Sequence, residues 1–239
     1  MDDNFSMTPQ SAFATTTVAG AERVTAFLQK VYGWMCVGLG ITASVAYGVA
    51  SSPAVLQAIV ANKFLFFGLV IAELGLVFYL SARVNRLAPG TAAGLFLLYS
   101  ALNGVTLAFI FLAYTGASIA TTFLVTAGMF GALALYGSTT RRSLAGVGQF
   151  VFMGLIGVLL ASVVGMFWHN SGLQFVISVV GVIVFTGLTA WDAQRLKQMA
   201  AVTPEGQVGS YAVVGALALY LDFINLFLFL LRFLGGRRD

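Results

Sequence analysis

The chain has 239 residues, of which 59% are hydrophobic and only 8% are charged. Soluble domains carry roughly 25% charged residues, so this composition indicates an integral membrane protein and excludes a soluble enzyme. The single cysteine, Cys36, excludes an intramolecular disulfide, and the single histidine, His169, leaves no cysteine–histidine cluster for zinc. The net charge of +4 lies in pairs of Lys and Arg between apolar runs, which indicates membrane topology rather than nucleic-acid binding.

In chain order, the sequence predicts a tail, a membrane domain and a second short tail. Residues 1–22 are small and polar and lack the basic start and apolar core of a signal peptide, so we expect a short disordered tail. Residues 23–236 form the transmembrane domain, and residues 237–239 form the C-terminal tail. Within the domain we expect seven apolar runs near the ~20 residues that a helix needs to cross a bilayer. These expected spans are residues 31–50, 64–82, 91–113, 119–138, 149–168, 173–191 and 211–234.

The apolar runs also define the fold class and its orientation. They are continuously apolar, without the alternation of barrel strands, so the prediction is an all-α polytopic bundle of seven transmembrane helices. Pairs of basic residues precede the first span and follow the second, fourth and sixth, which makes that side and the N-terminus cytoplasmic by the positive-inside rule. Seven spans then place the basic C-terminus outside, against this rule. A re-entrant last segment is the alternative, but residues 211–234 are long and apolar enough to cross.

Ionisable residues inside the spans are functional candidates, because insertion scales put their cost at roughly 2.5–3.5 kcal/mol at the centre of a helix. Glu73 lies in the outer half of the second span, and Asp222 lies near the middle of the last. Asp192 ends the sixth span, and Arg83 ends the second span at the same cytoplasmic level. Arg232 lies near the outer end of the last span. By depth, Glu73 matches Arg232, whereas the two aspartates match Arg83.

The two aspartates could form a pH sensor. Two carboxylates at similar depth in a low-dielectric bundle cannot both ionise cheaply, so one proton tends to be shared. A nearby arginine would favour the ionised form and could latch two helices together. The pair could also receive calcium, but Ca²⁺ prefers about six to eight oxygens, and Asp192 and Asp222 with Asn225 supply few. We therefore expect weak binding, which suits passage of the ion better than storage.

Two segments carry a resemblance to a known family. Leu219–Phe227, continuing to Gly235, resembles the last-span signature of the Bax inhibitor-1 family, and Thr189–Arg195 resembles its sixth-span signature in bacterial members. The resemblance covers the chain from about Arg23 to Gly236. It implies a seven-helix bundle with the last helix central and a pH-sensitive calcium leak, with no tightly bound cofactor. Calcium would be the transported ion.

The resemblance also implies roles for individual residues. Asp192 and Asp222 are implied to form a hydrogen-bonded pair that senses pH. An arginine at the cytoplasmic end of the second span is implied to latch that pair, and Arg83 is the nearest match, with Arg86 the alternative. Glu73 and Arg232 are implied to form a second pair, which would help to close the outer side of the bundle.

Other interpretations stay open at this point. The aspartates and Asn225 could only hydrogen-bond neighbouring helices, and the closing pair could be purely structural. The resemblance also implies a non-transporting regulator that binds a membrane protease complex, with residues 1–22 as the contact. Intramembrane aspartyl proteases likewise carry aspartates on adjacent spans, but they have Gly-x-Gly-Asp where this chain has Tyr220-Leu221-Asp222, so we expect no enzyme. The expected partners are membrane lipid and calcium, and the expected location is a bacterial inner membrane.

Overall fold

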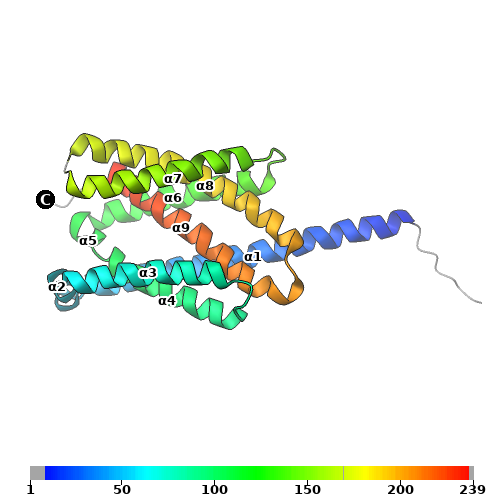
Figure 1. Cartoon of the computed structure of the whole chain (residues 1–239), viewed down its shortest axis with the longest axis horizontal. Coiled ribbons are helices and arrows are strands. Elements are labelled where there is room, and N and C mark those ends of the chain that lie inside the picture. The colour runs from blue at the N-terminus through cyan, green and yellow to red at the C-terminus, as the bar shows by residue number, and fades with distance from the viewer. Residues whose placement is uncertain (1–8, 169, 237–239) are drawn as a thin grey trace, which may run out of the picture.

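The structure, a computed structural model, describes residues 9–168 and 170–236. These residues contain helices and no strand, which confirms the all-α prediction (Figure 1). Seven segments of the described chain are long and apolar enough to cross a membrane, and each overlaps one of the expected spans. The elements are α1 (Pro9–Ala50), α2 (Pro53–Ala61), α3 (Lys63–Arg83), α4 (Pro89–Leu107), α5 (Ile110–Ala113), α6 (Gly116–Thr139), α7 (Ala145–Phe167), α8 (Ser171–Val202), the 3₁₀ helix η1 (Glu205–Gln207) and α9 (Val208–Leu234).

Local sequence signals start the helices that follow each turn. Pro53 and Pro89 occupy the first turns of α2 and α4, where a missing N–H breaks no helical bond. The side chains of Asn62, Thr115 and Asn170 cap α3, α6 and α8 by accepting hydrogen bonds from the backbone three residues later. Short capped turns therefore separate the apolar runs into antiparallel helices.

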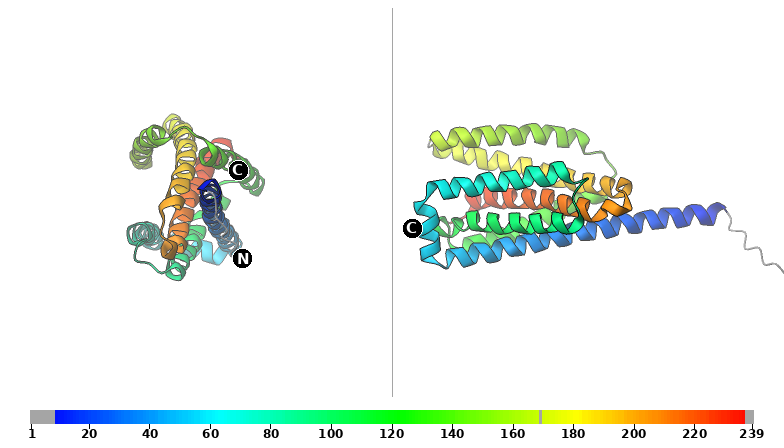
Figure 2. Two further views of the ribbon diagram at one scale, coloured as in Figure 1. Left: turned by 90° about the vertical axis from the view of Figure 1, so that its right-hand side faces the viewer. Right: turned by 60° about the horizontal axis from the view of Figure 1, so that its bottom comes forward.

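The last helix lies at the centre of the bundle, which confirms the prediction. Most of the residues of α9 are buried, and the helix packs against α1, α4, α6 and α8. Figure 2 shows α9 running between the other helices, with neighbours on both sides. A helix that is apolar around its whole circumference can be buried in this way. The residues that α9 carries are thus presented to several helices at once.

Two glycines bring α6 and α7 close to the C-terminal half of α8. A Cβ atom on Gly137 would lie 2.0 Å from the carbonyl oxygen of Ala190, and one on Gly148 would lie 2.3 Å from the Trp191 ring. Only glycine fits such a close approach of two helices. Because Ala190 and Trp191 directly precede Asp192, these contacts also set the position of Asp192 in the bundle.

The N-terminal helix differs from the prediction. Residues 1–8 lie outside the described chain, but from Pro9 onward the expected disordered tail is helical. No proline lies between Pro9 and Pro53, so the helix of the first span can continue toward the N-terminus without a break. The backbone of α1 projects beyond the other helices (Figures 1 and 2).

The basic turns gather at one end of the bundle. The Arg23 guanidinium donates to the carbonyl oxygen of Thr203, and Lys197 Nζ donates to that of Ser138 at 2.7 Å. These bonds join α1 to the turn after α8, and α8 to the end of α6. Arg23 and Lys197 therefore lie at the same end of the bundle, as the expected alternation of spans requires.

Candidate functional site

The structure brings Asp192 and Asp222 together. Asp192 projects from α8 and Asp222 from α9, and their carboxyl groups are close enough to interact electrostatically. Asp222 is only 5% exposed, and the side chain of Asp192 is 14% exposed. A hydrogen bond between two carboxyl groups needs a proton on one of them, because ionised carboxylates only accept. The pair can therefore hold a shared proton between the two helices.

One oxygen of this pair lacks a partner. Asp222 Oδ2 is buried and has no hydrogen bond within the described chain. A buried acceptor without a donor costs about 1–3 kcal/mol, and almost all such atoms in native proteins are paired. An atom of this kind marks a position where a proton, a water molecule or a cation can bind.

The cation beside Asp192 belongs to its own helix. Arg195 Nη1 lies 3.9 Å from Asp192 Oδ1, one helical turn away, and its side chain is 63% exposed. The Arg195 guanidinium also lies 5.5 Å from the centroid of the Trp191 ring. A long ion pair with one exposed partner contributes little to stability, but the charge of Arg195 favours the ionised form of the carboxylate.

The predicted latch contact is absent from this structure. Arg83 ends α3 and is exposed, as is Arg86 in the following turn. Among the described residues neither arginine forms an ion pair with an aspartate. The physical reason is packing, because α3 lies mainly against α4 and not against α8. Depth in the sequence does not show which side of the bundle Arg83 faces, and the latch role of Arg83 or Arg86 stays a prediction.

Asn225 has a local partner. Its Nδ2 donates to the carbonyl oxygen of Leu221, four residues earlier on α9, at 2.8 Å. Such a bond to the preceding turn is common for short polar side chains in helices. The amide nitrogen is thus engaged by its own helix, and the predicted supporting role of Asn225 remains a prediction.

Glu73 contacts neutral polar groups. It is buried, and its two carboxyl oxygens lie 3.2 Å from Asn103 Nδ2 and 3.0 Å from Thr106 Oγ1. The Asn103 amide in turn contacts the hydroxyl of Tyr220, which is fully buried on α9. Neither Asn103 and Thr106 as partners of Glu73 nor Tyr220 beyond them was predicted, although polar residues inside an apolar span and the tyrosine two positions before Asp222 were visible signals.

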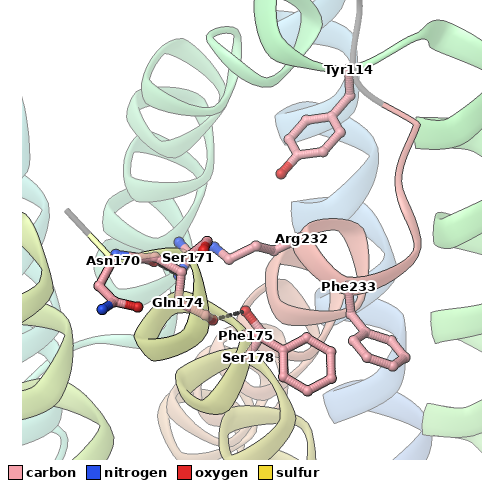
Figure 3. A pocket seen from close by; sticks show the side chains of 8 residues that line it. All are labelled: Tyr114, Asn170, Ser171, Gln174, Phe175, Ser178, Arg232 and Phe233. Carbon is pink, nitrogen blue, oxygen red and sulfur yellow. Dashed lines mark hydrogen bonds between the residues drawn. The ribbon is translucent and has the colours of Figure 1, made fainter.

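Arg232 has partners on a different side of the bundle from Glu73. Its Nη1 donates to Gln174 Oε1 at 3.3 Å, and its guanidinium lies 5.8 Å from the centroid of the Phe229 ring. Figure 3 shows the Arg232 side chain reaching from α9 toward the start of α8. The predicted ion pair with Glu73 is therefore not formed in the described chain, because Arg232 points toward α8 whereas Glu73 points toward α4. The arginine borders a pocket of about 510 Å³, lined also by Tyr114, Asn170, Ser171, Gln174, Phe175, Ser178 and Phe233.

A further residue missed by the sequence analysis holds the turn beside the aspartate pair. Gln194 Oε1 accepts from the backbone N–H of Leu144 at 2.8 Å, and Gln194 Nε2 donates to the Arg142 carbonyl oxygen at 2.9 Å. Gln194 is buried. It joins the turn between α6 and α7 to the helix that carries Asp192.

Asp192 and Asp222 offer few ligands to a metal ion. Within residues 9–168 and 170–236, no group of three or more Asp, Glu, His or Cys side chains is placed to hold a metal ion. Ca²⁺ takes about six to eight oxygens, so two aspartates alone could hold it only weakly. The arrangement can share a proton and can offer carboxylate oxygens to a passing cation.

Comparison with known proteins identifies the family. Residues 24–239 match the family model described as "Inhibitor of apoptosis-promoting Bax1". The chain belongs to the Bax inhibitor-1 family. The prediction made from the sixth and last spans is thereby confirmed. This is a family of membrane Bax-inhibitor type proteins and not a known enzyme family.

Bacterial members of the Bax inhibitor-1 family are similar over most of their length. "Inner membrane protein YbhL" of Escherichia coli K12 is 51% identical over 215 residues, which cover 89% of this chain and 92% of YbhL. A protein of Borreliella burgdorferi is 46% identical, with 89% of this chain and 93% of the relative covered. A protein of Rickettsia prowazekii is 41% identical, with 89% and 90% covered.

Proposed function

We propose that this Bax inhibitor-1 family protein is a pH-sensitive leak for calcium ions, with Asp192 and Asp222 as the sensor. The observation that supports the proposal best is the meeting of two carboxyl groups between α8 and the central helix α9. Asp222 Oδ2, buried and unpaired in the described chain, adds a free acceptor at the same place. Ionisable groups inside a membrane bundle commonly mark ion pathways and proton relays.

The mechanism follows from the charge of the pair. With one proton shared, the two carboxyl groups attract each other and hold α8 against α9. Loss of that proton places two negative charges side by side in a low-dielectric interior, where they repel strongly. The helices then separate at this point, and the ionised oxygens face the opening. A calcium ion can bind there transiently and move down its gradient.

Arg195 supplies the nearest positive charge in this mechanism. It lies one turn from Asp192 on the same helix and is mostly exposed. Its charge lowers the free energy of the ionised aspartate without joining α8 to another helix. We propose that Arg195 adjusts the pH at which the pair opens.

We also propose that the protein acts in a bacterial inner membrane with its basic end in the cytoplasm. The printed name of YbhL, an inner membrane protein, supports the membrane, and the gathering of basic turns at one end supports the orientation. Membrane lipid and calcium would be its partners. Tags placed in the turn after Thr203 and at the C-terminus of the protein in intact cells would test this orientation.

Calcium flux into proteoliposomes tests the leak. We would compare the natural chain with Asp192→Asn and Asp222→Asn from acidic to slightly alkaline pH, after checking that each protein is folded. Glu205→Gln is a matched control because Glu205 is exposed in the turn before α9. Flux that changes with pH in the natural chain and the control, but not in the aspartate variants, is the expected result. An unchanged pH profile in both aspartate variants would overturn the proposal.

A second candidate function is regulation of a membrane protease complex without transport. One observation favours it, namely that the backbone of α1 continues beyond the other helices at the basic end (Figure 1). A projecting helix offers a surface to a neighbouring protein. Photo-crosslinking residues placed between Pro9 and Glu22 in native membranes would capture a protease subunit, and failure at every position would count against this function.

A further inference from the structure

A buried chain of polar groups crosses the bundle on the side of α9 away from Asp222. Thr42 Oγ1 lies 2.8 Å from the Ser100 carbonyl oxygen and 2.6 Å from the Tyr220 hydroxyl. The Tyr220 hydroxyl lies 3.0 Å from Asn103 Oδ1, and Asn103 Nδ2 lies 3.2 Å from Glu73 Oε2. All five residues are buried. The chain thus connects α1, α4, α9 and α3.

The hydrogens in this chain can be counted. When the Asn103 amide oxygen faces Tyr220, the three contacts from the Ser100 carbonyl oxygen to Thr42, Tyr220 and the amide oxygen join only oxygen atoms. The two hydroxyl groups supply one hydrogen each, so two hydrogens serve three contacts. One buried oxygen–oxygen contact then has no hydrogen, which is unfavourable at these distances. This arrangement is the one that an ionised Glu73, accepting from Asn103 Nδ2, would require.

Rotating the side-chain amide of Asn103 by half a turn supplies the missing hydrogen. The turn exchanges its oxygen and nitrogen and leaves every other heavy atom in place. The amide nitrogen then donates to Tyr220, Tyr220 donates to Thr42, and Thr42 donates to the Ser100 carbonyl oxygen. The amide oxygen now faces Glu73 Oε2, and that contact needs a hydrogen on Glu73. All four contacts are satisfied when Glu73 carries a proton.

The surroundings of Glu73 contain no balancing positive charge. Within the described chain, no Lys or Arg lies within ion-pair distance of it. Lys63 and Arg83, at the two ends of α3, are each ten residues away, about 15 Å along the helix. The packed helices α2 and α4 carry no charged side chain, and the titratable groups that interact with Glu73 are Tyr99 and Tyr220. An ionised carboxylate among neutral donors in a low-dielectric interior is costly.

On α9, the remaining charged groups also lie away from Glu73. Asp222 faces Asp192 of α8, and Arg232 is bonded to Gln174 of α8. Tyr220 and Asp222 are two positions apart, which separates them by about 200° around a helix. The tyrosine therefore faces Glu73 while the aspartate faces the opposite side of α9.

We propose that Glu73 is a proton-binding site and that its proton completes the hydrogen-bond chain from Glu73 through Asn103, Tyr220 and Thr42 to Ser100. Loss of the proton turns the Asn103 amide and removes one hydrogen bond, so that the contact of α9 with α1 and α4 weakens. The central helix is thus held by a proton on each of two opposite sides. This site goes beyond the proposed calcium leak and does not depend on it.

Infrared spectroscopy of a singly labelled protein tests the proposal. The sequence contains three glutamates, Glu22, Glu73 and Glu205. The full-length double variant Glu22→Gln, Glu205→Gln leaves Glu73 alone, and cell-free synthesis can introduce glutamate with a ¹³C side-chain carboxyl. In lipid nanodiscs near neutral pH, every band that the label shifts belongs to Glu73. A shifted carbonyl band of a protonated acid is the expected result, whereas a shift of carboxylate bands alone would overturn the proposal.

Tyr220→Phe in the same labelled background tests the coupling along the chain. Without the phenol, the Asn103 amide no longer needs to donate toward α9, and we expect the protonated-acid band of Glu73 to shift or decrease. Tyr211→Phe is the matched control, because the Tyr211 hydroxyl bonds to Asn85 at the basic end of the same helix. An acid band that is identical in both variants would show that the Glu73 proton is not linked to Tyr220. Neither readout measures calcium flux, so failure here is distinct from failure of the leak.

Discussion

The buried carboxyl groups on the two sides of α9 have different hydrogen-bond partners. On the side facing α8, Asp222 meets another carboxyl group, and its Oδ2 has no partner within the described residues. On the side facing α3 and α4, both oxygens of Glu73 contact polar groups of α4. Both carboxyl groups are buried in the same bundle. On the aspartate side a buried oxygen lacks a hydrogen bond, whereas Glu73 is part of a continuous hydrogen-bond network.

This difference indicates two roles for a buried carboxyl group, one in stabilising the fold and one in responding to protonation. A network in which every group is paired makes a core rigid and specifies its arrangement. A buried pair with an unpaired acceptor stores unfavourable free energy that a change of protonation can release. We therefore expect substitution of the aspartates themselves to act mainly on gating, and substitution within the Glu73 network to act mainly on stability.

The largest expected effect comes from the contact that positions the aspartate side. Gly137→Ala would place a Cβ atom 2.0 Å from the Ala190 carbonyl oxygen, so α6 and α8 would have to move apart. We expect a loss of about 3 kcal/mol in the free energy of unfolding. Gly131→Ala on the same helix is the control, since nothing lies within 4 Å of the new atom. Thermal unfolding in detergent measures both, and equal melting temperatures would contradict the close approach of α6 to α8.

Breaking the network on the glutamate side should have the next largest effect. Asn103→Leu removes the amide between Glu73 and Tyr220 and leaves buried polar atoms without partners. We expect a loss of about 2 kcal/mol, measured by the same unfolding assay. Thr91→Val, at an exposed position of α4, should change little. If the two variants unfold alike, the network does not stabilise the fold.

Releasing the turn beside the aspartates should expose a cleavage site. Gln194→Ala removes the acceptor of the buried Leu144 N–H, which should destabilise the turn by about 1–2 kcal/mol. Trypsin should then cleave after Arg142 faster than in the natural chain. Gln198→Ala, at an exposed position of α8, is the control. Cleavage at the natural rate would show that Gln194 does not hold the turn.

The aspartate side should give a change of opposite sign. Asp222→Asn supplies an N–H that can donate to Asp192, and it removes the repulsion between two carboxyl groups. We expect a gain of about 1 kcal/mol in the free energy of unfolding near neutral pH. Glu73→Gln should bring no gain, because the Glu73 oxygens already have partners. A less stable Asp222→Asn protein would remove the distinction between the two sides.

The smallest effect is expected at the surface of the aspartate side. Arg195 is 63% exposed and 3.9 Å from Asp192, so Arg195→Gln should change stability by less than about 0.5 kcal/mol. Its charge should nevertheless shift the pH profile of calcium flux. The exposed Arg141 provides a control variant, Arg141→Gln, with an unchanged profile. A shift of equal size in both variants would indicate a general surface charge effect.

Much of the fold could be predicted from the sequence because a bilayer imposes length and polarity on each span. Apolar runs of about twenty residues predicted the helices, and the alternation of basic turns predicted that they share one end. The segment around Asp222 indicated the family and the central last helix. The sequence predicts a tail over residues 1–22, whereas α1 begins at Pro9, because the small polar residues after Pro9 also allow a helix.

The partners of the site residues were harder to predict. Depth within a span follows from position in the sequence, and together with the resemblance it predicted the pairing of Asp192 with Asp222; in the structure the two carboxyl groups interact. The same reasoning paired Glu73 with Arg232, which instead contact Asn103 and Gln174. Residues at one depth can lie on different sides of a bundle, and depth does not distinguish them.

The sequence by itself therefore determined the class of protein, the number of its spans and the approximate depth of each ionisable group. The tertiary structure decided which groups meet. That choice depends on the rotation of each helix about its axis and on close approaches such as Gly137 against Ala190, which involve residues far apart in the chain. In the structure Asp222 faces Asp192 of α8 and Tyr220 contacts Asn103 of α4, so a carboxyl group lies on each side of the central helix.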